Sequence, residues 1–359
     1  MKTAFGAEFE LPERYHLLNT LGQGAYGLVC AAKDVQTGKK VAIKKINSAF
    51  ENPVDGKRTL REIQLLRHLQ HENIITLLDI IAPKSYKHFK DVYLVIEFME
   101  TDMYRIIQSP QPLTDEHCQC FIYQILRALK YMHSAHVIHR DLKPRNILLN
   151  ANCDLRLCDF GLARVADPSQ SSQEFLTQYV ATRWYRAPEV LLASPGTSNY
   201  GAAMDIWAVG CIFGELLARR ALFPGTDHRN QLQTIISVLG SPSPAEIDAL
   251  ATGAVRNHLK QMPFYPKVPM AKAFPNGSPT ALDLLEKMLQ FDPSNRITIE
   301  EALQHPYLKL LHDPEDEPLA DKPFTSPWEG DQLTSAELKG MIYDEIRHYH
   351  PELPARRKK

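Results

Sequence analysis

Four polar residues in the middle of the chain could carry out a group transfer. The run His139–Asn146 reads HRDLKPRN and contains Asp141, Lys143 and Asn146, and Asp159 opens the later run DFG. An aspartate can accept a hydrogen bond from an attacking hydroxyl and orient it, and a lysine can place positive charge beside a transferring phosphoryl group. Asparagine and aspartate oxygens are hard ligands of the kind that Mg²⁺ prefers. No protein nucleophile is required.

A glycine-rich run near the N-terminus could hold phosphate groups. The apolar residues that follow it, Leu28–Ala31, predict a strand where a dinucleotide-binding unit would have a helix, so the glycines are expected in a hairpin. Backbone N–H groups without a neighbouring Cβ can approach phosphates closely, and a plain β-turn is the alternative. The G-x-G-x-x-G pattern comprises Gly22, Gln23, Gly24, Ala25, Tyr26 and Gly27.

A lysine in the next predicted strand is the expected partner of those phosphates. Residues 41–44 read VAIK, and a lysine among apolar neighbours needs an anionic partner. Glu62, on the predicted helix, is the natural candidate, and the ion pair would hold Lys44 on the α- and β-phosphates. The alternative is a surface lysine on an edge strand, a role for which Lys45 is the better candidate.

Two further motifs complete an ordered series. APE occupies residues 187–189, and Asp205 opens a long apolar stretch. With the motifs above, they resemble a eukaryotic protein kinase over residues 15–308. The resemblance implies an α+β fold with a small antiparallel-sheet lobe and a large helical lobe, and ATP and two Mg²⁺ ions as cofactors. A pseudokinase is the alternative, which the complete set of catalytic residue types disfavours.

The resemblance also assigns the residues around the nucleotide. The hinge, Glu97–Met99, would bind the adenine edge through its backbone, and Ile96 falls at the gatekeeper position. Cys158 would face the pocket, as a plain core thiol or a reactive one. His139 is expected to be structural and to pack near Phe160. Adenine would lie between four apolar side chains, Leu21, Val29, Ala42 and Leu148.

A T-x-Y sequence between DFG and APE marks the kinase group. Thr177 and Tyr179 flank Gln178, and VATRWYRAPE follows, which resembles a mitogen-activated protein kinase (MAP kinase). Gln178 departs from the commoner Glu, Gly or Pro. Phosphorylation of both residues would add about −3 to −4 charge to the loop. Pairing with the family's phosphate-binding arginines would order the loop and fix the helix that carries Glu62. These arginines are Arg61, Arg140 and Arg164.

The same segment and the C-terminal region imply how protein substrates bind. The resemblance places the P+1 site at Val180, Arg183 and Arg186, where a substrate proline is favoured because it lacks an N–H that would stay unpaired. Arg145 stands where serine is usual, and would either affect peptide choice or point to solvent. The acidic run after His312 resembles the common docking site for basic peptides, with a solvated acidic turn as the alternative. Its acids are Asp313, Glu315, Asp316 and Glu317.

The hydrophobic pattern predicts the elements that position these residues. Short strands with one helix are expected over residues 15–98, and helices dominate residues 102–308. The resemblance assigns an insert to about 225–275, an N-terminal extension to 1–14 and a C-terminal extension with a basic tail to 309–359. The proline-rich stretches 242–275 and 306–327 are predicted as irregular connections. Helices are expected over 58–69, from Thr114 onward, and over 204–218, 228–239, 279–290 and 298–305.

Composition excludes several classes of protein. The 359 residues have a formal net charge of −1, which argues against a nucleic-acid coat or a polybasic membrane-surface protein. Six cysteines without a CxxC pair predict free thiols in a reducing compartment. The N-terminal residues do not resemble a signal peptide. We therefore expect a monomeric cytoplasmic protein, entering the nucleus on activation, with no nucleic acid and no membrane among its partners.

These observations favour a MAP kinase activated by an upstream dual-specificity MAP kinase kinase. Substrates and phosphatases would bind it through basic docking peptides. A docking scaffold with little turnover and a kinase that depends on a cyclin-like partner are the alternatives. The helix sequence RTLREI lacks the cyclin-contacting sequence, which disfavours the second of them.

Overall fold

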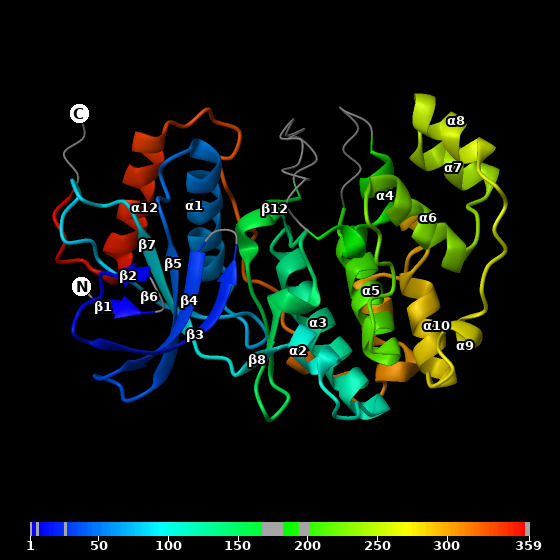
Figure 1. Ribbon diagram of the computed structural model, residues 1–359, viewed down its shortest axis with the longest axis horizontal. Helices are drawn as coiled ribbons and strands as arrows, with labels where there is room; N and C mark the ends of the chain where they lie inside the picture. The colour runs from blue at the N-terminus through cyan, green and yellow to red at the C-terminus, as the bar shows by residue number, and fades with distance from the viewer. Residues whose placement is uncertain (1, 5–6, 25–26, 167–181, 194–200, 356–359) are drawn as a thin grey trace. The chain divides into compact units, whose positions relative to one another are not determined.

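The computed structural model divides the chain into two compact units (Figure 1). The first unit is discontinuous and consists of Met1–Glu100, Asp159–Leu162 and Thr325–Lys359. The second unit consists of Thr101–Cys158 and Ala163–Phe324. The DFG run therefore belongs to the same unit as the N-terminal residues. The lobe boundaries predicted from the sequence had placed it in the large lobe. The structure describes residues 2–4, 7–24, 27–166, 182–193 and 201–355.

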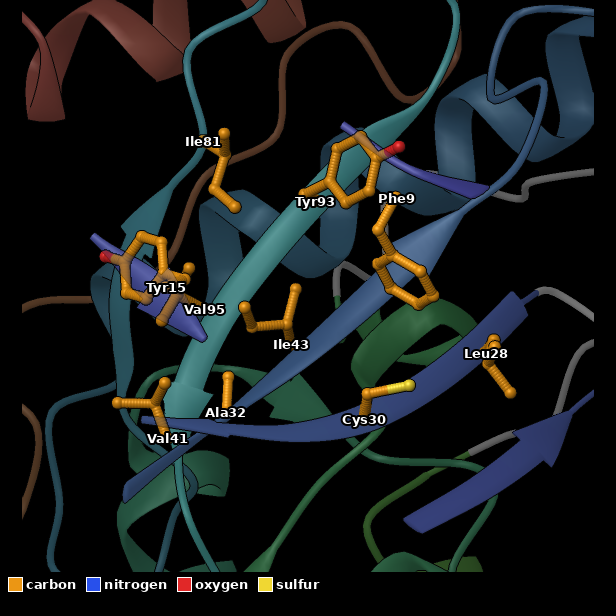
Figure 2. Close-up of a cluster of buried hydrophobic side chains, with 10 residues drawn as sticks. All are labelled: Phe9, Tyr15, Leu28, Cys30, Ala32, Val41, Ile43, Ile81, Tyr93 and Val95. Atoms are coloured by element: carbon orange, nitrogen blue, oxygen red, sulfur yellow. The ribbon is translucent and has the colours of Figure 1, made fainter. Parts of the chain in front are cut away.

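A five-stranded antiparallel sheet forms the body of the first unit, in the order β3-β4-β5-β7-β6. Alternate residues of a strand face opposite sides, so β4, β5 and β7 each contribute apolar side chains to one face. Figure 2 shows the buried cluster on this face, in which Phe9, Tyr15 and Ile81 pack with side chains of these three strands. The strands are β3 (Tyr15–Gly24), β4 (Gly27–Asp34), β5 (Lys40–Ile46), β6 (Leu77–Ile80) and β7 (Val92–Glu97), and β1 (Lys2–Ala4) pairs with β2 (Ala7–Phe9).

Two helices lie side by side in the first unit, α1 (Pro53–His68) and α12 (Ser335–Tyr349) (Figure 1). The prediction that the first helix begins at residue 58 is wrong, because the helix begins five residues earlier, at Pro53, and Asn52 caps it. Its side chain accepts a hydrogen bond from the Asp55 N–H at 2.9 Å, and Pro53 occupies the first helical position. The C-terminal extension thus supplies a helix that packs against α1.

The second unit is mainly helical, and α5 (Ala203–Ala218) lies in its core between α3 (Asp115–Ser134) and α10 (Pro279–Met288) (Figure 1). The Thr114 side chain caps α3, as the sequence predicts. Most residues of α5 are buried, including Trp207 and Phe213, which confirms its prediction as a core helix. These buried helices provide the rigid base for the loops between them.

The proline-rich stretch 242–275 contains three short helices, so its prediction as irregular is wrong. Ser243 and Glu246 form a capping box with Pro244 at the first helical position, a local signal that the pattern analysis overlooked. The predicted helix 228–239 is confirmed. The further helices are α2 (Met103–Gln108), α4 (Pro188–Leu192), α6 (His228–Leu239), α7 (Pro244–Leu250), α8 (Gly253–Gln261), α9 (Met270–Ala273) and α11 (Ile299–Leu303).

Short strands and 3-10 turns connect these helices near the HRDLKPRN run. β10 lies between β11 and β8, and β12 pairs with β9. The strands are β8 (Thr101–Asp102), β9 (Val137–Ile138), β10 (Ile147–Leu149), β11 (Leu155–Leu157) and β12 (Arg164–Val165). The 3-10 turns are η1 (Pro144–Asn146), η2 (Phe160–Leu162), η3 (Arg183–Tyr185), η4 (Pro293–Asn295), η5 (Pro306–Leu308) and η6 (Pro314–Asp316).

Candidate active site

One face of the five-stranded sheet carries four of the predicted nucleotide residues of the first unit. The strand register places Val29 opposite Lys44 and Ala42 opposite Ile96. Residues 42 and 44 of one strand point to the same side, so all four side chains share the face opposite the cluster in Figure 2. Leu21 lies at the irregularity of β3 between Thr20 and Gly22.

The glycine-rich run forms a hairpin between β3 and β4, as the sequence predicts. Gln23 pairs with Leu28, and Gly24 pairs with Gly27. A Cβ atom at Gly27 would lie 1.8 Å from the Lys45 carbonyl oxygen, so only glycine lets the two strands approach there. Ala25 and Tyr26 lie outside the described residues.

Lys44 binds the carboxylate that the sequence assigned to it. Its Nζ lies 2.6 Å from Glu62 Oε1 on α1 and 3.8 Å from Asp159 Oδ1. Burial raises the pKa of Glu62 above its ordinary value, and the charge of Lys44 opposes this shift. The first unit therefore brings a lysine, a glutamate and the DFG aspartate together.

The interpretation of Lys45 as a surface lysine is wrong. Its side chain is buried, and Nζ donates to the Glu8 carbonyl oxygen at 2.6 Å and lies 3.1 Å from Asp91 Oδ2. The rings of Phe9 and Tyr93 also face the ammonium group, each at 5.7 Å. Glu8 and Phe9, which precede the five-stranded sheet in the chain, therefore help to bury this lysine.

The predicted hinge is fixed at its first residue. The Glu97 N–H donates to the Thr76 carbonyl oxygen at 3.1 Å, and Glu97 Oε1 accepts from the Thr76 N–H at 2.9 Å. Met99 is buried. Leu148 and Cys158 belong to the second unit, where the Cys158 N–H donates to the Asn146 carbonyl oxygen at 3.0 Å.

The HRDLKPRN run of the second unit gathers three of the predicted catalytic and metal-binding residues. Lys143 Nζ donates to Asp141 Oδ2 at 2.6 Å. The Asn146 amide nitrogen donates to the Asp141 carbonyl oxygen at 2.8 Å and to Oδ2 at 3.1 Å. With its nitrogen directed at Asp141, the Asn146 amide keeps its oxygen as the atom suited to a hard cation.

Asp205 fixes the backbone of this loop through hydrogen bonds to its carboxylate. Oδ1 accepts from the Arg140 N–H and Oδ2 from the His139 N–H, both at 2.9 Å, and Oδ2 lies 2.9 Å from His133 Nε2. Burial acts to raise the pKa of Asp205, but the His133 hydrogen bond and the nearby charges outweigh it and lower that pKa. Arg140 has a φ of 69°, so the anchored backbone takes an uncommon conformation. Sequence reasoning found Asp205 without finding this role.

His139 is fully buried, and its Nε2 lies 3.2 Å from the Cys158 carbonyl oxygen. The imidazole therefore connects the start of the HRDLKPRN loop to the residue that follows the β10–β11 hairpin. Phe160, the neighbour expected for it, belongs to the first unit, where it is also fully buried.

The predicted phosphate-binding arginines have different surroundings. Arg61 is buried, and its guanidinium donates to the Glu329 carboxylate and, at 2.8 Å, to the Gly161 carbonyl oxygen. In the second unit, Arg164 pairs with Ile138 across β12 and β9, and Arg140 follows two residues after Ile138. Thr177, Tyr179 and Val180 lie outside the described residues.

Two of the predicted P+1 residues, Arg183 and Arg186, lie at a turn that α5 and α6 support. Arg183 donates to the Thr226 carbonyl oxygen at 3.0 Å, and the Arg186 N–H donates to the Arg183 carbonyl oxygen at 3.1 Å. Between them, the Tyr185 hydroxyl donates to Glu215 Oε2 at 2.7 Å. The following APE glutamate forms a buried, two-pronged ion pair with Arg296, at 2.8 and 2.9 Å, which sequence reasoning missed.

The acidic run divides into exposed and buried carboxylates. Glu317 is buried, and its two oxygens lie 2.9 Å from Lys130 Nζ and 2.7 Å from His312 Nδ1. It therefore holds the turn against α3 and does not face solvent. Asp313 and Asp316 are exposed, and Asp316 Oδ1 accepts from the Arg127 guanidinium at 2.7 Å. Glu315 is also exposed, so three of the four acidic side chains face solvent.

All six cysteines are free thiols, as predicted from their spacing. Cys30, Cys118 and Cys211 are buried, and burial raises the pKa of each thiol. Among the described residues, no helix is both long enough and apolar enough to span a membrane.

Comparison with known proteins decides between the classes that this geometry allows. The family described as protein kinase domain matches residues 15–308. Mitogen-activated protein kinase 4 of Arabidopsis thaliana is 53% identical over 349 residues, which are 97% of this chain and 91% of that protein. The chain belongs to the MAP kinase family. Mitogen-activated protein kinase 6 of the same plant is 52% identical, with 97% and 86% covered.

Extracellular signal-regulated kinase 1 of Dictyostelium discoideum is 54% identical over 350 residues, which are 98% of this MAP kinase and 65% of that protein. These similarities make the chain a serine/threonine protein kinase of signal transduction that uses ATP and Mg²⁺. They confirm the sequence-based recognition of the family, the α+β fold and the enzyme class.

Proposed function

We propose that this MAP kinase transfers the γ-phosphoryl group of ATP to serine or threonine residues followed by proline. The observation that carries the proposal is the hydrogen-bonded group of Asp141, Lys143 and Asn146. The Asp141 carboxylate would accept a hydrogen bond from the substrate hydroxyl and direct its oxygen at the phosphorus. The Lys143 ammonium would stabilise the charge on the transferring group.

Two Mg²⁺ ions would be held by the Asn146 amide oxygen and the Asp159 carboxylate. Both are hard oxygen donors, and the Asp159 side chain is 39% exposed, so a carboxylate oxygen is accessible to a ligand. When bound, the ions would offset the negative charge of the phosphates. Lys44, oriented by Glu62, would hold the α- and β-phosphates beneath the glycine hairpin.

Phosphorylation of Thr177 and Tyr179 by a dual-specificity MAP kinase kinase would switch the enzyme on. The pairing of β12 with β9, which carry Arg164 and lead into Arg140, supports a phosphate site in the second unit. Basic docking peptides of activators, substrates and phosphatases would bind the exposed Asp313 and Asp316. We further propose a monomer in the cytoplasm that enters the nucleus on activation.

A phosphotransfer assay on a basic protein with Ser-Pro sites tests the proposal. The doubly phosphorylated enzyme should label the substrate, and Asp141→Ala should abolish the labelling. Treatment with a phosphatase should remove the activity together with the phosphates on Thr177 and Tyr179. Unchanged activity after dephosphorylation would contradict the switch, and unchanged activity of Asp141→Ala would contradict the active site.

A further inference from the structure

Arg145 presents a positive charge beside the proposed catalytic residues. It is the middle residue of η1, the turn that joins Lys143 to Asn146. Both other residues of the turn, Pro144 and Asn146, are buried, whereas Arg145 is exposed. Packing and the Asn146 hydrogen bonds therefore fix the backbone of the turn, and its arginine points outward.

An aromatic ring holds the guanidinium in place. The Arg145 Cζ atom lies 3.9 Å from the centroid of the Tyr104 ring, which is contact distance for a stacked cation. Stacking covers a flat face of a guanidinium and leaves its N–H edge available to a ligand. Tyr104 lies on α2, whose last carbonyl oxygens, of Ile106 and Ile107, accept hydrogen bonds from Arg219 at 3.0 and 2.9 Å.

Arg145 lacks the carboxylate partner that several other arginines of the chain have. Arg61, Arg127 and Arg296 each pair with a glutamate or an aspartate. No ion pair of Arg145 occurs within the part of the chain that the structure describes. Its charge acts on the Tyr185 phenol, whose pKa burial raises and Arg145 partly lowers, so the cation lies near the predicted P+1 turn.

We propose that Arg145 is a specificity residue that binds an anionic side chain of the protein substrate, a carboxylate or a phosphate. The planar guanidinium edge matches either group with two hydrogen bonds. This inference rests on the proposed role of Asp141, which fixes where the substrate hydroxyl lies. Four residues of chain span at most about 14 Å, and an extended peptide advances about 3.3 Å per residue, so the anion lies within about four residues of the phosphorylated one.

Steady-state kinetics with matched peptides test the inference. Peptides with one Ser-Pro site carry glutamate, phosphoserine or alanine at each position from four residues before the site to four after it, the site itself excepted. The phosphorylated wild-type enzyme should prefer an anion at one of these positions by about 5- to 20-fold in kcat/KM. Arg145→Ser should reduce this preference to below twofold and leave alanine peptides unaffected.

Three variants separate a specificity role from a structural one. Arg145→Lys should keep part of the preference, because it keeps the charge and loses the planar edge. Tyr104→Leu should weaken the preference through loss of the stack, and Arg220→Ser, at an exposed arginine of the same unit, should change nothing. An equal preference in wild type and Arg145→Ser, or none in wild type, would overturn the inference. Loss of activity on every peptide in wild type would instead contradict the proposed function.

Discussion

The pair Lys44–Glu62 of the first unit and the pair Lys143–Asp141 of the second have the same length and different origins. In each, the lysine nitrogen lies 2.6 Å from a carboxylate oxygen, and the side-chain exposures are almost equal. Lys143 and Asp141 are two residues apart on one loop, whereas Lys44 and Glu62 are 18 apart on a strand and a helix. The pair Lys143–Asp141 needs only a loop of one shape, whereas the pair Lys44–Glu62 needs a sheet and a helix packed together.

The two pairs also differ in which residue has two partners. Lys44 lies between two carboxylates, Glu62 and Asp159, so its charge is divided. Asp141 is instead the shared partner, since both Lys143 and the Asn146 amide donate to it. A shared cation is suited to a further anion such as phosphate, and a carboxylate oriented by two donors is suited to accept a hydrogen bond from a hydroxyl group. The following variants test this difference.

Asp141→Asn should have the largest effect. The amide keeps the shape of the carboxylate but not its charge, so kcat should fall about 1000-fold while the melting temperature changes little. The control is Asp154→Asn, which replaces an exposed aspartate of the same unit and should keep full activity. A fall of less than tenfold for Asp141→Asn would remove this residue from the chemistry.

Lys44→Met should have the second-largest effect. Without the ammonium group, the phosphates lose a charged contact, and kcat/KM for ATP should fall about 100-fold. The exposed Lys39 provides a control, since Lys39→Met removes the same charge away from the pair. Steady-state kinetics at varied ATP concentration measure both, and an unchanged KM and kcat in Lys44→Met would contradict the phosphate-binding role.

Asp205→Asn should destabilise the second unit by about 1–3 kcal/mol, because an amide group meets backbone N–H donors where a carboxylate accepted three hydrogen bonds. The folded-state pKa of Asp205 is lowered, so its contribution is present above its ordinary pKa and is lost as the pH falls through the folded value. Urea unfolding at several pH values should show wild type and Asp205→Asn converging in acid. Parallel curves would contradict the assignment.

Glu62→Gln should have the smallest effect, with about a tenfold fall in activity near neutral pH, because the amide still bonds Lys44 without its charge. The folded-state pKa of Glu62 is raised, so protonation in mild acid should lower wild-type activity and leave the glutamine variant unaffected. The stability that this residue contributes is present below its ordinary pKa of 4.5 and is lost as the pH rises through the folded value. Identical acid limbs in both activity profiles would contradict this role.

Local signals predicted the local parts of the site. The VAIK and HRDLKPRN runs indicated Lys44 and Asp141, and the strand after the glycines indicated a hairpin that the structure confirms. The start of α1 is marked by an equally local signal, the Asn52 cap followed by Pro53, and the helix begins there, earlier than predicted. These features depend on a few neighbouring residues, so their patterns are visible in the sequence.

Contacts between distant segments could not be predicted in the same way. Arg61 and Glu329 are 268 residues apart, and Arg296 and Glu189 are 107 apart. No pattern in either segment names its partner, because tertiary packing chooses it. Lys45 shows the same limit, since its burial depends on Phe9 and Tyr93 covering it.

The discontinuity of the first unit affects how the protein is made. During synthesis the sheet and α1 leave the ribosome early, but Glu329 and α12, against which α1 packs, leave it only after the second unit. Until then the Arg61 guanidinium cannot pair with the Glu329 carboxylate, and the side of α1 that packs against α12 is exposed. The nascent chain therefore holds an unfinished N-terminal unit while the whole second unit is made, a state exposed to chaperones and proteases until α12 emerges.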